Sequence, residues 1–144
     1  MINTNEECVE FDEKRKKIVM EELGKSYILN NRSELRIRGI RIDDCLIKNP
    51  FERCDFMLDI FSSPKKRAIL VELQGRKTIY KGISQLISTI NILNADLKDK
   101  VLDARIICGG VPRLEPSNKP KLLKILKDSG GSLKIKTNSY EETI

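Results

Sequence analysis

The chain has 144 residues, 40% hydrophobic and 33% charged, which indicates one ordered soluble domain and argues against disorder. Lysine and arginine number 27 against 21 acidic residues, and the net charge of +6 suits an anionic partner or simply a basic protein. The absence of histidine excludes a Ser-His or Cys-His nucleophile, and four cysteines without a C-x-x-C pair argue against a zinc site.

The cysteines and the N-terminus both suggest a cytoplasmic protein. Cys45, Cys54 and Cys108 stand in apolar contexts, where a free cysteine behaves as a small hydrophobic residue, so reduced thiols are expected. The first residues contain no apolar stretch typical of a signal peptide, and no apolar run is long enough to span a membrane.

Residues 6–24 are predicted to form a helix. Apolar residues recur there at helical spacing, at Phe11, Ile18, Val19 and Leu23. Gly24 is a plausible helix end. Glu22 would project from nearly the same face as the apolar residues, where its carboxylate either lies at the rim with its head in solvent or belongs to a site.

The next segments are predicted strands. Residues 26–30 form a short strand, and residues 34–42 alternate between apolar and polar side chains. The alternation changes phase at Gly39, which suggests a bulge or a tight bend there.

The second half of the chain alternates between predicted strands and helices. A hairpin joins residues 53–61 to residues 68–73 through a loop containing Pro64, and residues 77–94 form the clearest amphipathic helix. Residues 104–108 form a buried strand, a helix capped by Asn118 runs to Gly130, and residues 132–137 form a last strand. This order predicts an α/β sandwich with a mixed central sheet.

Chemistry is expected on the predicted hairpin. Strand alternation places Asp55 beside Glu72 on one sheet face, with Gln74 one pleat further along. Glu72 lies within an otherwise apolar strand, where a carboxylate is unfavourable unless it is paired or binds a metal. A shared Mg²⁺ would relieve both burial and repulsion. The alternative is structural ion pairing, of Asp55 with Arg53 or Arg76 and of Glu72 with Lys77.

The residues Asp55 and Glu72-Leu73-Gln74 resemble the PD-(D/E)XK phosphodiesterase superfamily, which includes restriction-type endonucleases and Holliday-junction resolvases. The resemblance covers the topology of roughly residues 6–108 and implies a single restriction-endonuclease-like domain, an α/β sandwich whose mixed sheet is flanked by helices. It implies an endonuclease that hydrolyses DNA with Mg²⁺ or Mn²⁺ bound by Asp55, Glu72 and the Leu73 carbonyl. Gln74 stands where most members carry lysine, and it can orient a water but supplies no charge.

The resemblance also suggests supporting residues. Glu22 is the candidate for a further metal-binding carboxylate, with Glu34 as its competitor. Gln85 would contact phosphate or water, or else lie on a solvated helix face. Lys77 or Lys81 could replace the missing lysine charge, or both could be ordinary solvent-facing lysines.

Arg36 and Arg38 share one predicted strand face and, with Lys81, are the candidates for phosphate contacts. No groove-reading motif is visible, so weak or structure-based selectivity is expected. Many members of the superfamily pair as homodimers. Two alternatives to an active nuclease stay open. One is an inactive nuclease-like domain or subunit that binds nucleic acid. The other is an unrelated interaction protein, which would require Asp55 and Glu72 to lie far apart or to be engaged by arginines.

Overall fold

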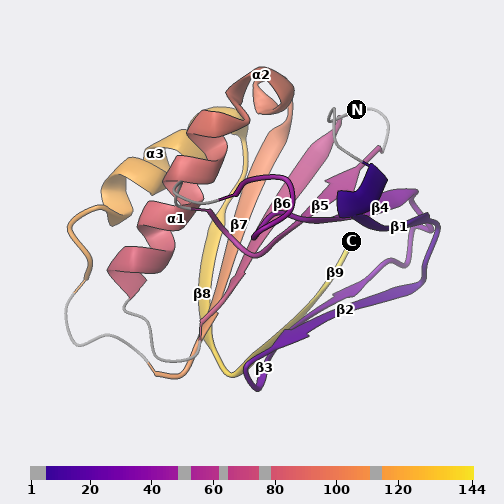
Figure 1. Ribbon diagram of the computed structural model, residues 1–144, viewed down its shortest axis with the longest axis horizontal. Coiled ribbons are helices and arrows are strands. Elements are labelled where there is room, and N and C mark those ends of the chain that lie inside the picture. The colour runs from indigo at the N-terminus through magenta and orange to yellow at the C-terminus, as the bar shows by residue number, and fades with distance from the viewer. Residues whose placement is uncertain (1–5, 49–52, 62–64, 75–78, 111–114) are drawn as a thin grey trace.

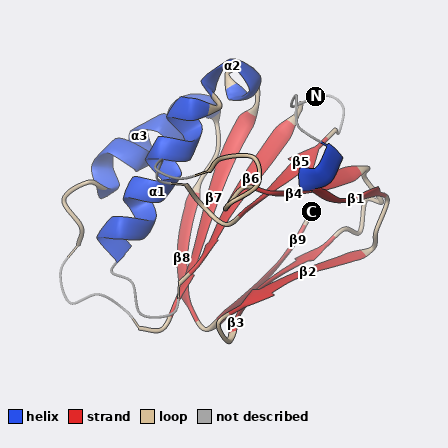
Figure 2. Cartoon of the chain, viewed as in Figure 1, coloured by secondary structure: helices blue, strands red, loops and turns tan. Residues whose placement is uncertain are grey.

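The computed structural model describes residues 6–48, 53–61, 65–74, 79–110 and 115–144. Three layers are visible, with helices on one side, a large sheet in the middle and a small sheet on the other side (Figures 1 and 2). The large sheet has the strand order β1 (Val9–Glu13), β4 (Ile37–Arg41), β5 (Phe56–Ile60), β6 (Arg67–Leu73), β7 (Val101–Cys108) and β8 (Leu133–Thr137). The small sheet contains β2 (Lys17–Glu22), β3 (Lys25–Asn30) and β9 (Ser139–Thr143). The helical elements are the 3-10 turn η1 (Glu6–Cys8), α1 (Ile79–Ile92), α2 (Asn94–Leu97) and α3 (Lys119–Ser129).

The large sheet is mixed. The pairs β1–β4, β4–β5 and β5–β6 are antiparallel, whereas β6–β7 and β7–β8 are parallel. The parallel pairs follow from the helices, because α1 and α3 carry the chain back along the sheet before the next strand begins. The predicted α/β class with a mixed sheet is therefore confirmed.

Two hydrophobic cores lie on opposite faces of the large sheet, and they explain the pattern around Gly39. Leu35 and Ile37 pack into the core beneath the small sheet, whereas Ile40 and Ile42 pack into the core beneath the helices. A strand buried on both faces has apolar residues at odd and even positions without any change of phase. The predicted bulge at Gly39 is therefore wrong for β4.

The irregularity lies instead in the neighbouring strand β1. Its register with β4 shifts between Val9 and Phe11, so Glu10 is the extra residue of a bulge opposite Gly39. A Cβ at Gly39 would lie only 2.6 Å from Phe11 Cζ. Glycine is needed there because the Phe11 ring packs directly on the backbone of β4.

The predicted N-terminal helix is also wrong, since residues 6–24 form η1 and two strands. In β2, Ile18 and Met20 are buried while Val19 and Glu21 are exposed, which is the alternation of a strand with one covered face. Pairing with β3 and burial against the large sheet outweigh the helical spacing of a few apolar residues.

Gly24 ends a strand rather than a helix. Leu23 and Gly24 have φ values of 53° and 71° and form the turn of the β2–β3 hairpin. Glu22 is therefore the last residue of β2, next to this turn.

Later elements agree better with the predictions. The predicted strands and helices after residue 53 correspond to β5, β6, α1, β7, α3 and β8, whereas β9 was not foreseen. Pro64 lies outside the described residues. Asn118 precedes α3 as predicted, but its side chain donates to the Tyr80 carbonyl instead of capping the helix. Within the described ranges, none of the helices combines the length and apolar character needed to cross a membrane.

A disulfide joins Cys8 to Cys45, whereas Cys54 and Cys108 are buried free thiols. Pairing of β1 with β4 brings Cys8, just before β1, close to the turn that contains Cys45. The expectation of reduced thiols is therefore wrong for this pair. That expectation rested on the apolar surroundings of Cys45, Cys54 and Cys108, which say nothing about the position of Cys8.

Replacing both Cys8 and Cys45 with serine should lower the free energy of unfolding by up to about 4 kcal/mol, because the bond closes a loop with a sequence separation of 37 residues. Urea denaturation with and without dithiothreitol measures the effect. The double variant, with no bond to break, serves as the control and should not respond to the reductant. An unchanged urea midpoint for the reduced wild type would contradict a stabilising disulfide.

Candidate functional site

Asp55 lies at the end of the β5–β6 pair. Phe56 lies opposite Val71, and extending this antiparallel register by one residue places Asp55 opposite Glu72. The backbone N–H of Leu73 donates to Asp55 Oδ2 at 2.8 Å. The structure therefore brings Asp55 beside the Glu72-Leu73 backbone, where the sequence pattern predicted it.

Glu72 and Gln74 lie on the helix-facing side of β6, and both side chains are fully buried. The buried thiol of Cys54 lies close enough to feel the charges of the motif carboxylates. Burial raises its pKa, and the nearby carboxylates of Glu72 and Asp55 add to this increase. The two acidic residues of the motif and Cys54 thus share one buried region between β5, β6 and α1.

Gln74 packs directly against α1. Its backbone N–H donates to Ile107 O at 2.8 Å, and its side chain covers Gly82. A Cβ on Gly82 would lie 2.8 Å from Gln74 Cδ. The Gln74 amide therefore occupies the space that a side chain at residue 82 would need.

Thr89 joins α1 to the segment before Asp55. Its buried hydroxyl accepts a hydrogen bond from Cys54 N–H and donates one to the Gln85 carbonyl, each at 2.8 Å. Gln85 is buried on the same helix face as Gly82 and Thr89. Of the two alternatives for Gln85, the solvated helix face is therefore excluded.

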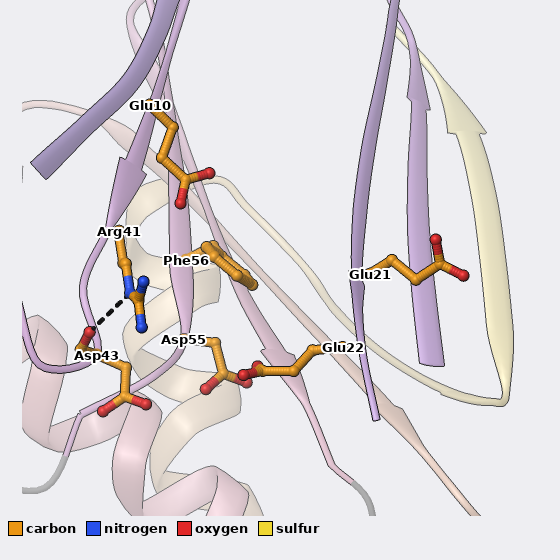
Figure 3. A pocket seen from close by; sticks show the side chains of 7 residues that line it. All are labelled: Glu10, Glu21, Glu22, Arg41, Asp43, Asp55 and Phe56. Carbon is orange, nitrogen blue, oxygen red and sulfur yellow. Dashed lines mark hydrogen bonds between the residues drawn. The ribbon is translucent and has the colours of Figure 1, made fainter. Parts of the chain in front are cut away.

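Asp55 also lines a pocket between the two sheets. Figure 3 shows the carboxyl groups of Asp55 and Glu22 pointing toward each other, with Glu10 pointing into the same space and Glu21 pointing away. Arg41 and Asp43 complete the rim, and Arg41 Nε donates to the Asp43 carbonyl at 3.2 Å.

Glu22 thus lies near Asp55, as the resemblance suggested, although it belongs to strand β2 and not to the predicted helix. Its competitor Glu34 is exposed, and its carboxylate lies 3.9 Å from Lys16 Nζ. Glu10 and Asp43 were missed. The only signal for Glu10 is the bulge in β1, which cannot be recognised without knowing that β1 pairs with β4.

The donor set suits a hard cation bound by few protein ligands. Across the described ranges, no group of three or more Cys, Asp or Glu side chains is placed to hold a metal ion. Mg²⁺ is commonly held by one or two carboxylates, with water and substrate oxygens at the other positions. Facing carboxylates such as Asp55 and Glu22 are stabilised by a cation between them, so these residues fit Mg²⁺ or Mn²⁺.

The predicted phosphate-binding residues lie in different environments. Arg36 forms a bidentate ion pair with Asp12, with two contacts of 2.8 Å, and this hydrogen-bonded pair lowers the pKa of Asp12. Arg38 is only 7% exposed and lies opposite buried Asp59 in the β4–β5 register. A phosphate contact would have to displace Asp12 from Arg36 or draw Arg38 out of the core.

Of the two candidate lysines, only Lys81 belongs to the described residues. Lys81 is exposed on α1, whereas Lys77 lies outside the described residues.

Comparison with models of known protein families, with curated proteins and with solved structures found no significant match.

Replacing Gly82 with alanine should destabilise the protein by about 1–3 kcal/mol, because the new methyl group overlaps the buried Gln74 side chain. In a Gln74→Ala background the same change should become neutral or favourable, since alanine is preferred over glycine in helices by about 1 kcal/mol. Urea denaturation of the four proteins gives this coupling. Stabilisation of the wild type by Gly82→Ala would show that Gln74 does not occupy this position.

Proposed function

We propose that this protein is a Mg²⁺- or Mn²⁺-dependent endonuclease that hydrolyses phosphodiester bonds of DNA, with a restriction-endonuclease-like PD-(D/E)XK arrangement. One observation carries the proposal. The Leu73 N–H···Asp55 hydrogen bond holds Asp55 at the Glu72-Leu73-Gln74 segment, while Glu22 faces Asp55 from the other sheet.

Asp55 and Glu22 would hold the metal ion in this proposal, with the Leu73 carbonyl and Glu72 as the further ligands implied by the resemblance. A bound Mg²⁺ would polarise a phosphate oxygen and lower the pKa of a coordinated water. Leu73 N–H orients the Asp55 carboxylate toward the pocket. Glu72 is fully buried and does not line the pocket, so it would have to reach the ion from the interior of the protein.

Gln74 would orient a water through its amide, and its packing on Gly82 limits the positions that this amide can take. Gln74 cannot supply the positive charge that lysine would. Lys81, which is exposed on the same helix as Gly82, is the candidate to supply that charge. Gln85, buried one turn further along α1, would support the same region.

A second candidate function is binding of nucleic acid without cleavage. It is favoured by Gln74 itself, since a fully buried, uncharged amide stands where most members of the superfamily carry lysine. The net charge of +6 supports a nucleic-acid partner in either case. Pairing as a homodimer would let the enzyme cut both strands.

The cytoplasmic location expected from the sequence stays a prediction. A persistent bond between Cys8 and Cys45 would instead favour an oxidising compartment.

Removing one charge of the facing pair should weaken metal binding. Asp55→Asn and Glu22→Gln should each weaken Mg²⁺ affinity at least about tenfold, because each removes one of the two carboxylates that face each other. Calorimetric titration with Mg²⁺ and Mn²⁺ measures affinity, and cleavage of single-stranded, duplex and branched DNA measures activity. Asp128→Asn, on the exposed face of α3, is the matched control and should behave as wild type.

The two candidate functions give different results. Metal binding that depends on Asp55, together with cleavage, supports the endonuclease. DNA binding with neither metal binding nor cleavage supports the inactive domain. Cleavage that survives Asp55→Asn would exclude the proposed site.

A further inference from the structure

A second hollow adjoins the pocket that Asp55 and Glu22 line, which we call the acidic pocket. It has a volume of about 580 Å³ and lies between β1 and β2, and we call it the inter-sheet cleft. Its lining residues are Glu10, Phe11, Arg15, Val19, Met20, Glu21 and Phe56. Glu10, Glu21 and Phe56 also line the acidic pocket, so the two hollows are neighbours. A ligand held in the cleft would therefore lie near the pocket that contains Asp55 and Glu22.

One wall of the cleft is a preformed stack. The Phe11 ring packs on the backbone at Gly39, and the Arg15 guanidinium carbon lies 4.2 Å from the ring centroid. Glu13 fixes this guanidinium through two hydrogen bonds, from Nε at 3.0 Å and from Nη2 at 2.6 Å. The Arg15 side chain is nevertheless 42% exposed. Its planar group is thus held in place and open to a ligand.

The opposite wall offers hydrogen-bonding groups. Among the described strands β2 is an edge strand of the small sheet, so its outer backbone N–H and C=O groups are not bound to a further strand. Glu10 also lines the cleft and adds a carboxylate to it. Phe56, partly buried on β5, adds an aromatic surface.

The chemistry of the cleft favours a nucleobase over a phosphate. A phosphate would meet the carboxylates of Glu10 and Glu13, and the charge of Arg15 is already engaged by Glu13. A base is uncharged, stacks on guanidinium planes and aromatic rings, and donates its amino hydrogens to carboxylate or carbonyl oxygens. A base within a duplex is stacked and paired and cannot enter such a cleft.

We infer that the inter-sheet cleft binds one unpaired nucleobase of a single-stranded or locally unpaired substrate, with Arg15 as the stacking residue. The inference rests on the proposed function, because it places the captured base next to the phosphate to be cut. It assigns the substrate class that the acidic pocket alone does not determine.

The test compares binding to bases with binding to the backbone alone. Fluorescence anisotropy measures the affinity of a labelled single-stranded oligodeoxycytidylate, whose bases carry amino groups, and of an abasic oligonucleotide of equal length, in EDTA so that no cleavage occurs. The wild type should bind the base-containing strand about tenfold more tightly, as one stacked base contributes. A fully paired duplex of that length should compete poorly.

Two variants of Arg15 separate stacking from charge. Arg15→Lys keeps the positive charge but loses the plane, and Arg15→Gln loses both, so each should abolish the preference for the base-containing strand. Lys136→Gln is the matched control. It removes a cation from another ring contact, 5.3 Å from the Tyr140 centroid, and should keep the preference. Arg15 is exposed, so both variants should unfold at the wild-type urea concentration.

Equal affinity of the wild type for the two strands, or for the duplex, would overturn base capture. So would an unchanged preference in Arg15→Lys, which would make Arg15 a phosphate contact. The Mg²⁺ cleavage assay, run on the same proteins, is read separately. A base preference without cleavage would refute the nuclease but keep the cleft, whereas cleavage without a base preference would refute the cleft alone.

Discussion

The pairing of β5 with β6 determines the environment of Asp55, Glu72 and Gln74. Its register places Phe56 opposite Val71 and directs alternate side chains toward two different cores. A slip of one residue would exchange those faces, moving Glu72 and Gln74 from the helix side to the small-sheet side. At the end of the strand pair, Leu73 N–H donates a hydrogen bond to the Asp55 side chain and so holds that carboxylate beside β6. The geometry of the site is thus a consequence of how both cores are packed.

The helix side completes the site through α1. Gly82 leaves room for the Gln74 side chain, and Thr89 bonds the backbone just before Asp55. Both contacts come from one helix face that carries small or polar residues among isoleucines and leucines. Two residues of the motif on different strands are therefore held by one rigid element. A site with few ligands requires such support, because a small displacement of a ligand side chain takes it out of the geometry needed for binding.

The β5–β6 hairpin, α1, β7 and α3 could be predicted from the sequence, because strand alternation and helical periodicity are local signals. Asp55 and Glu72 could be paired for the same reason. The N-terminal strands could not be recognised, since β2 becomes a strand through pairing with β3 and burial on the large sheet. The inter-sheet cleft could not be predicted from the sequence either. Only 5% of the residues are aromatic, so the composition does not point to a stacking surface, and the Gly39–Phe11–Arg15 arrangement depends on the pairing of β1 with β4.

The proposed endonuclease requires one cation between the two sheets. A crystal grown or soaked with Mn²⁺ and measured near the manganese absorption edge would locate that ion directly. We expect an anomalous difference peak between the carboxyl groups of Asp55 and Glu22, on the side of the Leu73 backbone. Manganese bound only elsewhere, or an empty pocket at millimolar Mn²⁺, would contradict the proposed metal-dependent chemistry.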